Sequence, residues 1–490
     1  MRLHILDAVI IAVYLIGITL FGLRFRKSQR SLRDYFLADR NIPWWAIALS
    51  IVAAETSTLT VIGTPGIAYA GTFGFLQLVL GYMLGRVVIS LIFIPQYFRG
   101  EMFTAYQLID RRFGKILHRT TAGIFLATRA AAEGVRVWAV SIVVHTALGT
   151  SDIGSIAIVM LLTLIYTFEG GMAAVIWTDV IQMVIYVGGT IAGFLTLTHL
   201  VPGGWPAIHA ASAQAGKMQV FDFSSIFVAG TFFKTYTFWA GLIGGMFLTT
   251  ASHGTDQLMV QRLLSARNER DSKIALLSSG VVILFQFTLF LLVGTGLWVY
   301  YRTFPPNTPF PSNDHVFPTF IVDHLPIGMS GLLIAAILAA AMSNLSAALN
   351  SLSSTTMMDF YLRFKPETSE KSRMGISRGA TVVWGVVLFG LAMLSRQSKT
   401  VLETGLGIAS VAYGGLLGVF LLGVLTRRAT QAGAVLGMLC GLALNLYLWK
   451  GTHIAWTWYV TFGATTTFIV GYAASMILKD NPTPAENNGN

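Results

Sequence analysis

The 490-residue sequence has few charged residues and a single cysteine. Asp, Glu, Lys and Arg make up 11% of the chain, less than half of the roughly 25% that is usual in soluble proteins. Hydrophobic residues make up 54%, and the mean hydropathy is +0.67. These values exclude an ordinary soluble domain and indicate a protein with many membrane-spanning segments. One cysteine, Cys440, also excludes an intramolecular disulfide.

Long polar regions are scarce as well. The longest connectors, near 201–223 and 302–323, contain Pro and Gly, and 479–490 has the composition of a disordered tail. The net charge of +11 does not indicate a nucleic-acid partner, because the basic residues lie in short loops between apolar runs. We therefore expect one transmembrane domain over residues 1–478, with the first apolar run retained rather than cleaved as a signal peptide.

Apolar runs of the length that a membrane requires recur along the whole chain. A spanning helix needs about 20 mostly apolar residues. The sequence predicts thirteen such segments: 4–24, 43–71, 73–98, 118–147, 152–168, 173–200, 224–252, 273–301, 324–362, 374–395, 398–426, 429–449 and 455–478. Most lysines and arginines fall in alternate loops, which predicts an external N-terminus and a cytoplasmic C-terminus. The expected location is the cell (inner or plasma) membrane, with the lipid bilayer as a partner.

Several ionisable residues are predicted at membrane depth, where a charge is costly and each one suggests a functional site. They are Glu55, Arg86, Arg129, Glu133, Arg136, Asp179 and Lys234. Glu133 and Arg136 stand three residues apart, so they can neutralise each other on one helix face. For Arg86, Arg129 and Lys234, we expect the side chain to extend to the membrane surface.

Two predicted spans carry residues that weaken a helix. The stretch "AAETSTLTVIGTPG" (53–66) combines hydroxyls with Gly and Pro, and such a segment can unwind and expose carbonyl oxygens. "FWAGLIGGMFLTTASHGT" (238–255) has Gly241, Gly244 and Gly245 at its middle. Interrupted helices in two halves indicate an inverted-repeat transporter. Close packing of helices through small residues explains the glycines equally well.

A polar stripe runs along another predicted span. In "AAAMSNLSAALNSLSS" (339–354), Ser343, Ser346, Asn350 and Ser354 recur every three or four residues and so share one helix face. Facing carbonyls of a broken helix, this stripe makes an oxygen-rich pocket suited to a small hard cation such as Na⁺. Hydroxyls that bond back to their own helix are the alternative.

Four motifs together resemble one family. They are "SIVAAETSTLTVIGTPG", "GGMAAVIWTDVIQ" (170–182), "GTDQLMVQRLL" (254–264) and "AAAMSNLSAALNSLSSTTMMDFY" (339–361). With them the chain resembles the sodium:solute symporter family over about residues 5–450. The resemblance implies an all-α LeuT-type fold: two inverted five-helix repeats (43–200 and 224–426), an extra N-terminal helix (4–24) and two C-terminal helices (429–478).

The resemblance also implies a set of sodium ligands. These are the carbonyls of Ala53, Thr56 and Ala340, the hydroxyl of Ser343, and Asn344, an amide where the family has a hydroxyl. Sodium is therefore the expected coupling ion.

Members of the family with a second sodium use an aspartate and two serines. Asp179 and Ser346 match two of these positions, but Ala347 stands at the third. A second cation site at Asp179 is accordingly in doubt. Asp179 then either tunes the first site as a lone charge or serves as a structural hydrogen-bond acceptor.

Solute residues follow from the sialic-acid-type members of the family. Arg136, Ser57 and Thr60 match the positions that hold a carboxylate there, and guanidinium suits forked carboxylate recognition. Glu55 replaces a hydroxyl. Either it pairs with Arg136 across the empty cavity, or it holds a substrate amine, or Glu133 neutralises Arg136 and neither touches solute.

Gln77 and Lys234 are weaker candidates for lining the solute cavity. A hexose is not expected, because apolar residues occupy the stretches 74–81 and 406–413 where sugar transporters of the family carry polar groups. The predicted function is sodium-coupled import of a small carboxylate-bearing or zwitterionic solute by alternating access.

Two alternatives to that function stay open, and a third is not expected. Proton coupling through Glu55 or Asp179 on the same scaffold is one, and uptake of a neutral or inorganic anionic solute is another. An enzyme is not expected, since the sequence has no H-E-x-x-H, no G-x-S-x-G and no paired carboxylates.

Overall fold

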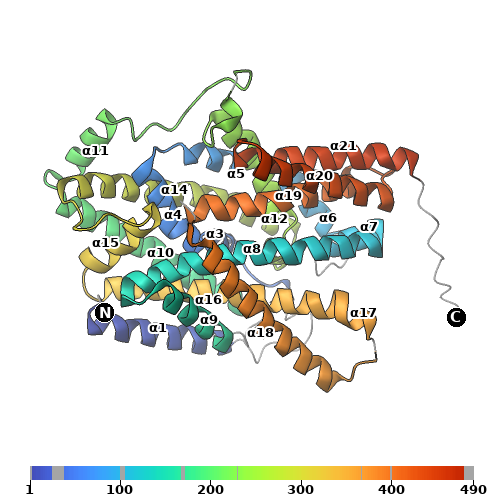
Figure 1. Cartoon of the computed structure of the whole chain (residues 1–490), viewed down its shortest axis with the longest axis horizontal. Coiled ribbons are helices and arrows are strands. Elements are labelled where there is room, and N and C mark those ends of the chain that lie inside the picture. Colours follow the sequence, from blue (N-terminus) through green and yellow to red (C-terminus); the bar gives the residue numbers. More distant parts are fainter. Residues whose placement is uncertain are drawn as a thin grey trace.

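Helices make up all the regular elements that the structure describes. The computed structural model describes residues 3–24, 38–99, 105–166, 172–228, 230–365, 367–397 and 400–478. The helices run side by side along the long axis of the molecule (Figure 1). Long apolar runs form helices because a helix satisfies its own backbone hydrogen bonds where no water is available. The predicted all-α architecture is confirmed.

The elements are as follows. The α-helices are α1 (Ile5–Leu23), α3 (Trp44–Glu55), α4 (Thr58–Ala70), α5 (Phe75–Ile92), α6 (Ile94–Tyr97), α7 (Tyr106–Phe113), α8 (Lys115–Leu148), α9 (Asp152–Tyr166), α10 (Met172–Leu200), α11 (Gly204–Gln214), α12 (Gly245–Gly254), α13 (Gln257–Leu264), α14 (Glu269–Thr303), α15 (Val316–His324), α16 (Met329–Thr355), α17 (Leu362–Phe364), α18 (Glu370–Leu394), α19 (Val401–Leu425), α20 (Gln431–Gly451) and α21 (Tyr459–Ile477). Short 3₁₀ or π turns are η2 (Ala38–Arg40), η3 (Thr231–Phe233), η4 (Ala240–Gly244), η5 (Asn313–His315), η6 (Thr356–Tyr361), η7 (Ser395–Gln397) and η8 (Trp456–Trp458).

Many of these helices are long enough to cross a membrane. Among the described residues, nine are long and apolar enough, and the α3–α4 pair forms a tenth, bent span. Two shorter apolar helices, Ile5–Phe21 and Asp152–Leu164, match further predicted spans. The multi-pass prediction is confirmed, while the count of thirteen stays a prediction. The predicted span 224–252 is wrong in its first half, because the continuous helix that leads into α12 begins only at Phe238.

The two ends of the bundle carry different elements. α11 and α15 lie at one end, on the left of Figure 1, and α7 and α17 lie at the other. We call these the α11 end and the α7 end. α1 begins at the α11 end and α21 ends at the α7 end, as an odd number of crossings requires. The predicted connectors 201–223 and 302–323 contain α11, η5 and the start of α15 rather than coil alone.

Glycines bring α5 and the η4–α12 segment into backbone contact. A Cβ on Gly81 would stand 2.2 Å from the carbonyl oxygen of Gly241 and 2.8 Å from the Cα of Gly245. A Cβ on Gly244 would meet the carbonyl oxygen of Thr457 at 2.2 Å. These glycines therefore serve helix packing, the second of the two explanations that the sequence left open. The interruption lies further along, at Thr255 and Asp256 between α12 and α13.

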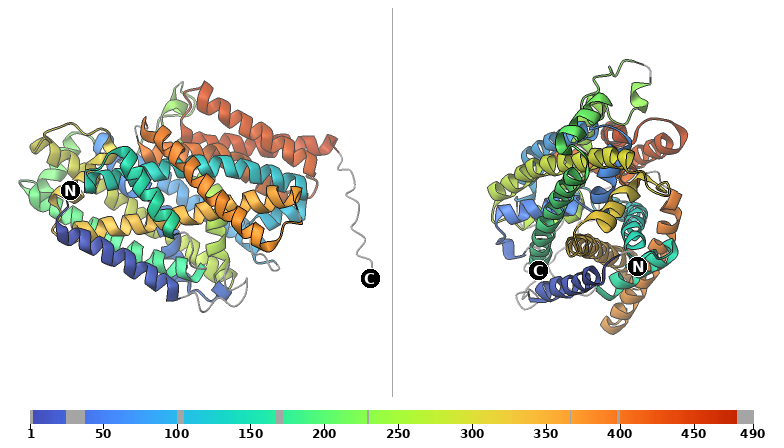
Figure 2. Two further views of the ribbon diagram at one scale, coloured as in Figure 1. Left: turned by 60° about the horizontal axis from the view of Figure 1, so that its bottom comes forward. Right: turned by 90° about the vertical axis from the view of Figure 1, so that its left-hand side faces the viewer.

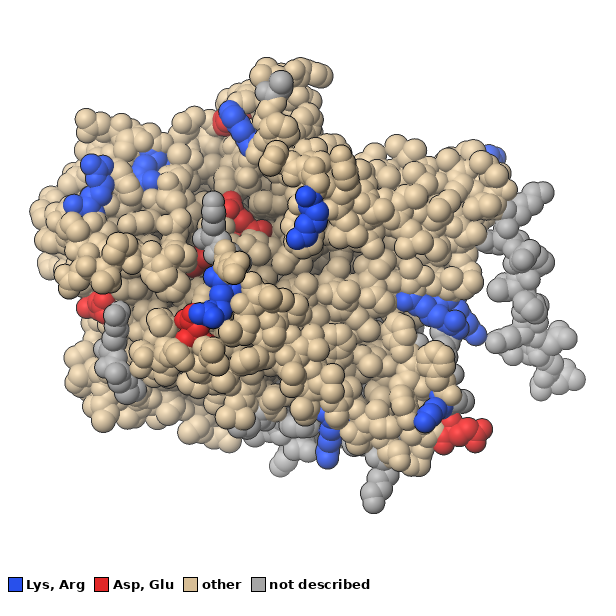
Figure 3. Space-filling model, in the orientation of Figure 1, with Lys and Arg blue, Asp and Glu red and all other residues tan. Residues whose placement is uncertain are grey.

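The N-terminal helix is attached to the start of α16. Asp7 Oδ1 accepts hydrogen bonds from the amides of Gly328 at 2.6 Å and Gly331 at 3.0 Å, the donors that a helix N-terminus leaves unpaired. α1 packs against α16 and α10, and the end-on view in Figure 2 shows it at the margin of the bundle. Charged residues are sparse on the face drawn in Figure 3, as a lipid-facing surface requires.

Candidate functional site

The helix break at Thr56 and Ser57 lies at the centre of the site. α3 ends at Glu55, α4 begins at Thr58, and the two axes bend by 64°. The last carbonyls of a helix lack a partner one turn further on. Hydroxyls compensate in part, because Thr60 Oγ1 donates to the Glu55 carbonyl at 3.1 Å. The predicted unwinding of this span is confirmed.

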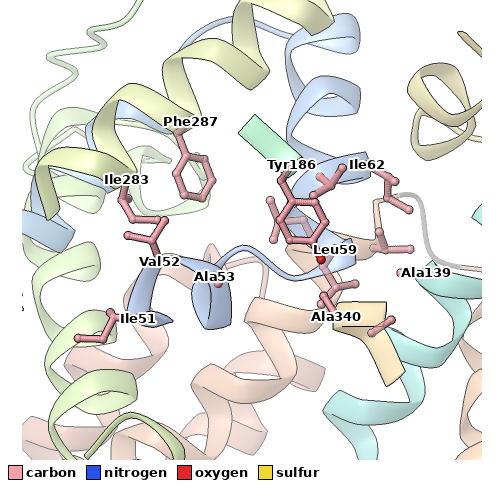
Figure 4. Close-up of a cluster of buried hydrophobic side chains, with 14 of the residues drawn as sticks. Ile51, Val52, Ala53, Leu59, Ile62, Ala139, Tyr186, Ile283, Phe287 and Ala340 are labelled. Carbon is pink, nitrogen blue, oxygen red and sulfur yellow. The ribbon is translucent and has the colours of Figure 1, made fainter. Parts of the chain in front are cut away.

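The middle of α16 faces the break. Figure 4 draws Ala53 at the end of α3 and Ala340 of α16 in one buried cluster, with Leu59 beyond the unwound turn. Ser346 is buried, and Ser343 and Asn344 are half-buried. The structure thus brings the end of α3 and this stretch of α16 to the same region. The assignment of these residues as sodium ligands stays a prediction.

Buried oxygens near the break fit a cation. Gln286 of α14 donates its amide to Thr56 Oγ1 at 2.8 Å, which leaves Gln286 Oε1 buried without a hydrogen-bond partner among the described residues. The hydroxyl of Thr58 is in the same condition. An unpaired buried acceptor costs free energy, and a hard cation at the break would compensate such oxygens.

A cavity of about 190 Å³ adjoins the break. Four of the five predicted solute residues line it, namely Glu55, Ser57, Thr60 and Arg136. Aromatic and aliphatic side chains from α5, α14 and α19 cover the remaining wall, including Phe75, Phe287 and Leu402. The cavity therefore combines a few convergent polar groups with apolar walls, as small-molecule sites usually do.

Glu55 is held by a partner that the sequence did not suggest. Its Oε2 accepts a hydrogen bond from Arg86, and the Nε2 of His253 lies 3.3 Å from the same oxygen. Arg86 is fully buried and also bonds to Ser279. The expectation that Arg86 extends to the membrane surface is therefore wrong, and the predicted pairing of Glu55 with Arg136 is not formed.

Arg136 pairs with Glu133 instead. Its Nη1 donates to Glu133 Oε1 at 2.6 Å, as the three-residue spacing allows. The same oxygen lies 3.1 Å from Arg129 Nη2, so one buried carboxylate serves two arginines. Arg129 does not extend to the surface either, since it lies in the cavity wall. Arg136 keeps about a fifth of its side chain exposed to the cavity.

The break in the second half contributes Asp256, which sequence reasoning missed. Its Oδ1 accepts from the Leu258 amide at 2.9 Å and caps α13, and its Oδ2 accepts from the Tyr413 hydroxyl at 3.0 Å. Both residues line the cavity. A signal is present in "GTDQ", a typical capping sequence, but these residues lie between the predicted spans 224–252 and 273–301. His253 was missed for the same reason.

Asp179 is buried away from solvent in an ion pair. Its Oδ2 accepts from Arg262 Nη2 at 2.9 Å and from Ser50 Oγ at 2.6 Å, and Arg262 Nε also donates to Ser50 at 2.9 Å. Of the two interpretations of Asp179, the lone tuning charge is wrong and the hydrogen-bond acceptor agrees with the geometry. Arg262 had been placed in a loop.

Gln77 and Lys234 do not line the cavity. Gln77 donates to the Tyr236 carbonyl at 3.3 Å and accepts from the Asp222 amide at 3.0 Å, so it fixes the loop before η4. Lys234 is exposed in that loop and pairs with Asp222 at 3.1 Å, outside the spanning helices. The expectation that Gln77 and Lys234 line the solute cavity is therefore wrong, because both side chains bind the loop before η4.

A second group of contacts covers the cavity at the α11 end. Tyr236 donates to Glu403 near the start of α19, and Phe75 stacks on Phe287 with ring centroids 5.0 Å apart. Asp314 of η5 accepts from the Val401 amide at 2.9 Å. These contacts join η5 and the loop before η4 to the first residues of α19, and the first residue of α5 to α14, beside the cavity.

Asp314 is an unusual element of this cover. It is fully buried, and its Oδ1 has no hydrogen-bond partner among the described residues. Burial raises the pKa of Asp314 from 3.8 to about 7; the nearby charge of Glu403 acts in the same direction, and the Val401 amide opposes both. The carboxyl therefore changes protonation state near neutral pH.

Comparisons with known proteins agree with this geometry. The sequence pattern of the Sodium:solute symporter family matches residues 35–441. The chain is 28% identical to the sodium/sialic acid symporter SiaT of Proteus mirabilis, over 96% of this chain and 95% of that protein. It is 30% identical to the sodium-dependent multivitamin transporter of Oryctolagus cuniculus, over 91% of this chain and 70% of that protein.

Similarity extends to three dimensions. The fold matches the substrate-bound outward-open state of a Na⁺-coupled sialic acid symporter with a TM-score of 0.82 and 26% identity, over 96% of this chain and 98% of that chain. The predicted LeuT-type fold is confirmed.

Proposed function

The chain belongs to the sodium:solute symporter family, and from this premise we propose that it imports a small carboxylate-bearing or zwitterionic solute together with sodium. Proteins of this family are secondary transporters coupled to sodium, so the chain is a transporter and not an enzyme. The carboxylate and the identity of the binding residues are the parts that we propose.

One observation carries the proposal: Arg136 and two hydroxyls share a cavity beside the helix break. Arg136, Ser57 and Thr60 all line it. A guanidinium offers paired donors that match the two oxygens of a carboxylate, and hydroxyls offer further donors. Glu133 holds Arg136 through a single oxygen at 2.6 Å, which orients the guanidinium and leaves donors for the solute.

Glu55 supplies a place for an amine. Both of its protein partners approach Oε2, and the residue lines the cavity, so Oε1 is free to accept from a solute. An amino acid or similar zwitterion would then place its carboxylate at Arg136 and its amine at Glu55. Thr60 lines the same cavity.

Sodium is proposed to bind where α3 unwinds. Its ligands would be the carbonyls of Ala53, Thr56 and Ala340 and the side chains of Ser343 and Asn344. Sodium at this place would fix the angle between α3 and α4 and so the positions of Ser57 and Thr60. Each ligand then raises the apparent affinity of the other.

The membrane potential provides the driving force. One positive charge that moves inward gains about 2.3 kcal/mol per 100 mV. We propose that the chain lies in the cell membrane with the α11 end outside and the α7 end in the cytoplasm. This orientation places most loop lysines and arginines inside. The repeats are proposed to comprise residues 43–200 and 224–426.

Thermal unfolding of the detergent-purified protein tests the proposal. The panel is N-acetylneuraminate, lactate, L-alanine and glucose, each in sodium chloride and in choline chloride at one pH. Binding to the folded form raises the unfolding midpoint. We expect a carboxylate of the panel to raise it in sodium and much less in choline. Equal stabilisation in choline would overturn sodium coupling, and stabilisation by glucose alone would overturn the carboxylate assignment.

A further inference from the structure

Arg129 repeats the environment of Arg136 two turns earlier on α8. Seven residues at 1.5 Å each separate the two by roughly 10 Å along the helix. They share a face, because Glu133 Oε1 lies 3.1 Å from Arg129 and 2.6 Å from Arg136. Both arginines line the cavity. The cavity wall therefore offers two guanidinium groups in line, and the proposed function uses only one of them.

On its other side, Arg129 faces the break of the second half. Its Nη1 lies 3.7 Å from Asp256 Oδ2, the oxygen to which Tyr413 donates at 3.0 Å. The three side chains come from α8, from the start of α13 and from α19. A separation of 3.7 Å is too long for a good hydrogen bond, so Asp256 and Arg129 form an ion pair without a direct hydrogen bond between them.

This contact stands at the junction of two cavities. A smaller cavity of about 40 Å³ shares five residues with the main one: Phe125, Thr128, Asp256, Ala412 and Tyr413. It continues past Tyr106, the first residue of α7, and Met438 of α20. The junction therefore leads from the main cavity toward the α7 end.

Charge at the junction is balanced but not saturated. Arg129 and Arg136 face Glu133 and Asp256, two charges of each sign. The Nε atoms of both arginines and Glu133 Oε2 are buried without a hydrogen-bond partner in the described part of the chain. The two unpaired Nε donors favour an additional anionic partner, whereas Glu133 Oε2 is an unpaired acceptor.

We propose that Arg129 is a second docking point for the anionic group of the solute. The group reaches it after Arg136, and the Arg129–Asp256–Tyr413 contact opens as the solute passes toward the α7 end. The inference rests on the proposed function for the statement that the solute is an anion. Arg129 would then select for a negatively charged solute during release, after Arg136 has done so during binding.

Cysteine labelling tests the inference without the solute. Ala412 lines both cavities, so Ala412→Cys in a Cys440→Ala background places one thiol at the junction. The probes are two methanethiosulfonates, one with a sulfonate group (MTSES) and one with a trimethylammonium group (MTSET). Labelling rates of detergent-purified protein, each divided by the rate with a free thiol, give a charge preference.

The expected result is a preference for the sulfonate reagent. Arg129→Gln should lower this preference roughly tenfold, because one close positive charge is lost, and Arg129→Lys should keep most of it. Arg129→Gln with Asp256→Asn avoids an unpaired buried acid, and it should also lose the preference because the guanidinium donors that would hold the sulfonate are absent. An unchanged preference in both glutamine variants would overturn the inference.

Folding and the proposed function are checked separately. Size-exclusion chromatography selects variants that remain monodisperse, and the double variant serves if Arg129→Gln alone aggregates. If no carboxylate raised the unfolding midpoint in sodium chloride, the proposed function would be overturned. The labelling rates would not be affected by that result. A lost preference in the lysine variant as well would mean that Arg129 acts only as a structural residue.

Discussion

Asp179 of α10 accepts a hydrogen bond from Arg262 of α13 at 2.9 Å, and both side chains are buried. The pair joins the two proposed repeats, since α10 closes the first and α13 belongs to the second. Arg262 and Ser50 occupy Asp179 Oδ2, so its charge is already neutralised. A second sodium is therefore not expected at Asp179 and Ser346 in this conformation.

Removal of one partner of this pair should destabilise the protein. Asp179→Asn leaves the Arg262 guanidinium buried without a counter-ion, which typically costs about 3 to 5 kcal/mol. The double variant with Arg262→Gln should recover much of this loss. Thermal unfolding in detergent measures both. A single variant as stable as the wild type would show that water or lipid reaches Arg262.

Ser343→Ala should weaken the binding of sodium more than the binding of solute. The hydroxyl is one of five proposed oxygen ligands, and loss of a charge-assisted contact costs roughly 1.5 to 3 kcal/mol. The sodium concentration for half-maximal stabilisation should rise about tenfold or more, while the effect of solute at saturating sodium stays similar. Ser354→Ala, an exposed serine of the same helix, is the matched control. Equal sodium dependence in both variants would remove Ser343 from the site.

Arg136→Gln should abolish stabilisation by any carboxylate that stabilises the wild type. The loss arises because the amide keeps hydrogen bonding but supplies no positive charge. Arg119→Gln, an exposed arginine earlier on α8, should leave the response unchanged. Sodium alone should still stabilise the Arg136 variant, which shows that it folds. If a carboxylate solute still stabilised the Arg136→Gln variant, the only role of Arg136 would be to pair with Glu133.

The sequence predicted those features of the fold that depend only on residues close to one another along the chain. Hydroxyls, Gly and Pro between residues 53 and 66 weaken one helix, and the break at Thr56 and Ser57 followed directly. The polar stripe of α16 likewise follows from spacing alone. Ser57, Thr60, Glu55 and Arg136 were predicted as solute residues from the family resemblance rather than from a local pattern, and all four line the cavity.

Partners of the buried charges were not predictable, because they depend on how helices far apart in sequence pack. Glu55 meets Arg86 from α5 and His253 from α12, 31 and 198 positions away, and no local pattern selects them over Arg136. The second break had a local signal in the capping residue Asp256, but the conspicuous glycines nearby outweighed it. Gly241 and Gly245 give α5 room to approach, and Gly244 does the same for Thr457, but a sequence does not show which segments pack there.

Stability should depend on pH through Asp314, which lies in η5 outside the spanning helices. Its pKa in the folded state is about 7, against an ordinary 3.8. The folded state therefore binds the proton more tightly, and stability falls as the pH rises from about 4 to about 7, by at most about 4 kcal/mol.

Asp314→Asn should remove this dependence on pH. At pH 8 the variant should therefore unfold at a higher temperature relative to the wild type than it does at pH 4. Unfolding midpoints across this range measure the difference. Asp323→Asn, an exposed acid of α15, is the control. Parallel pH profiles for the wild type and Asp314→Asn would mean that water solvates the carboxylate.

Gly81→Ala should destabilise the protein and disturb the cavity from a distance. The new Cβ would lie 2.2 Å from the Gly241 carbonyl oxygen, so α5 must move away from η4, at a cost typical of overpacking, about 1 to 3 kcal/mol. Gly188→Ala is the matched control, because its Cβ meets nothing within 4 Å and alanine favours the helix by up to about 1 kcal/mol.

Because α5 also carries Arg86, a shift of α5 draws the guanidinium away from Glu55. Gly81→Ala should therefore weaken solute-dependent stabilisation and raise the sensitivity to heat, whereas Gly188→Ala should do neither. Lower stability with an intact solute response would show that Glu55 keeps its place without Arg86. His253, 3.3 Å from the same carboxylate oxygen, would then be the partner that holds Glu55 at the cavity.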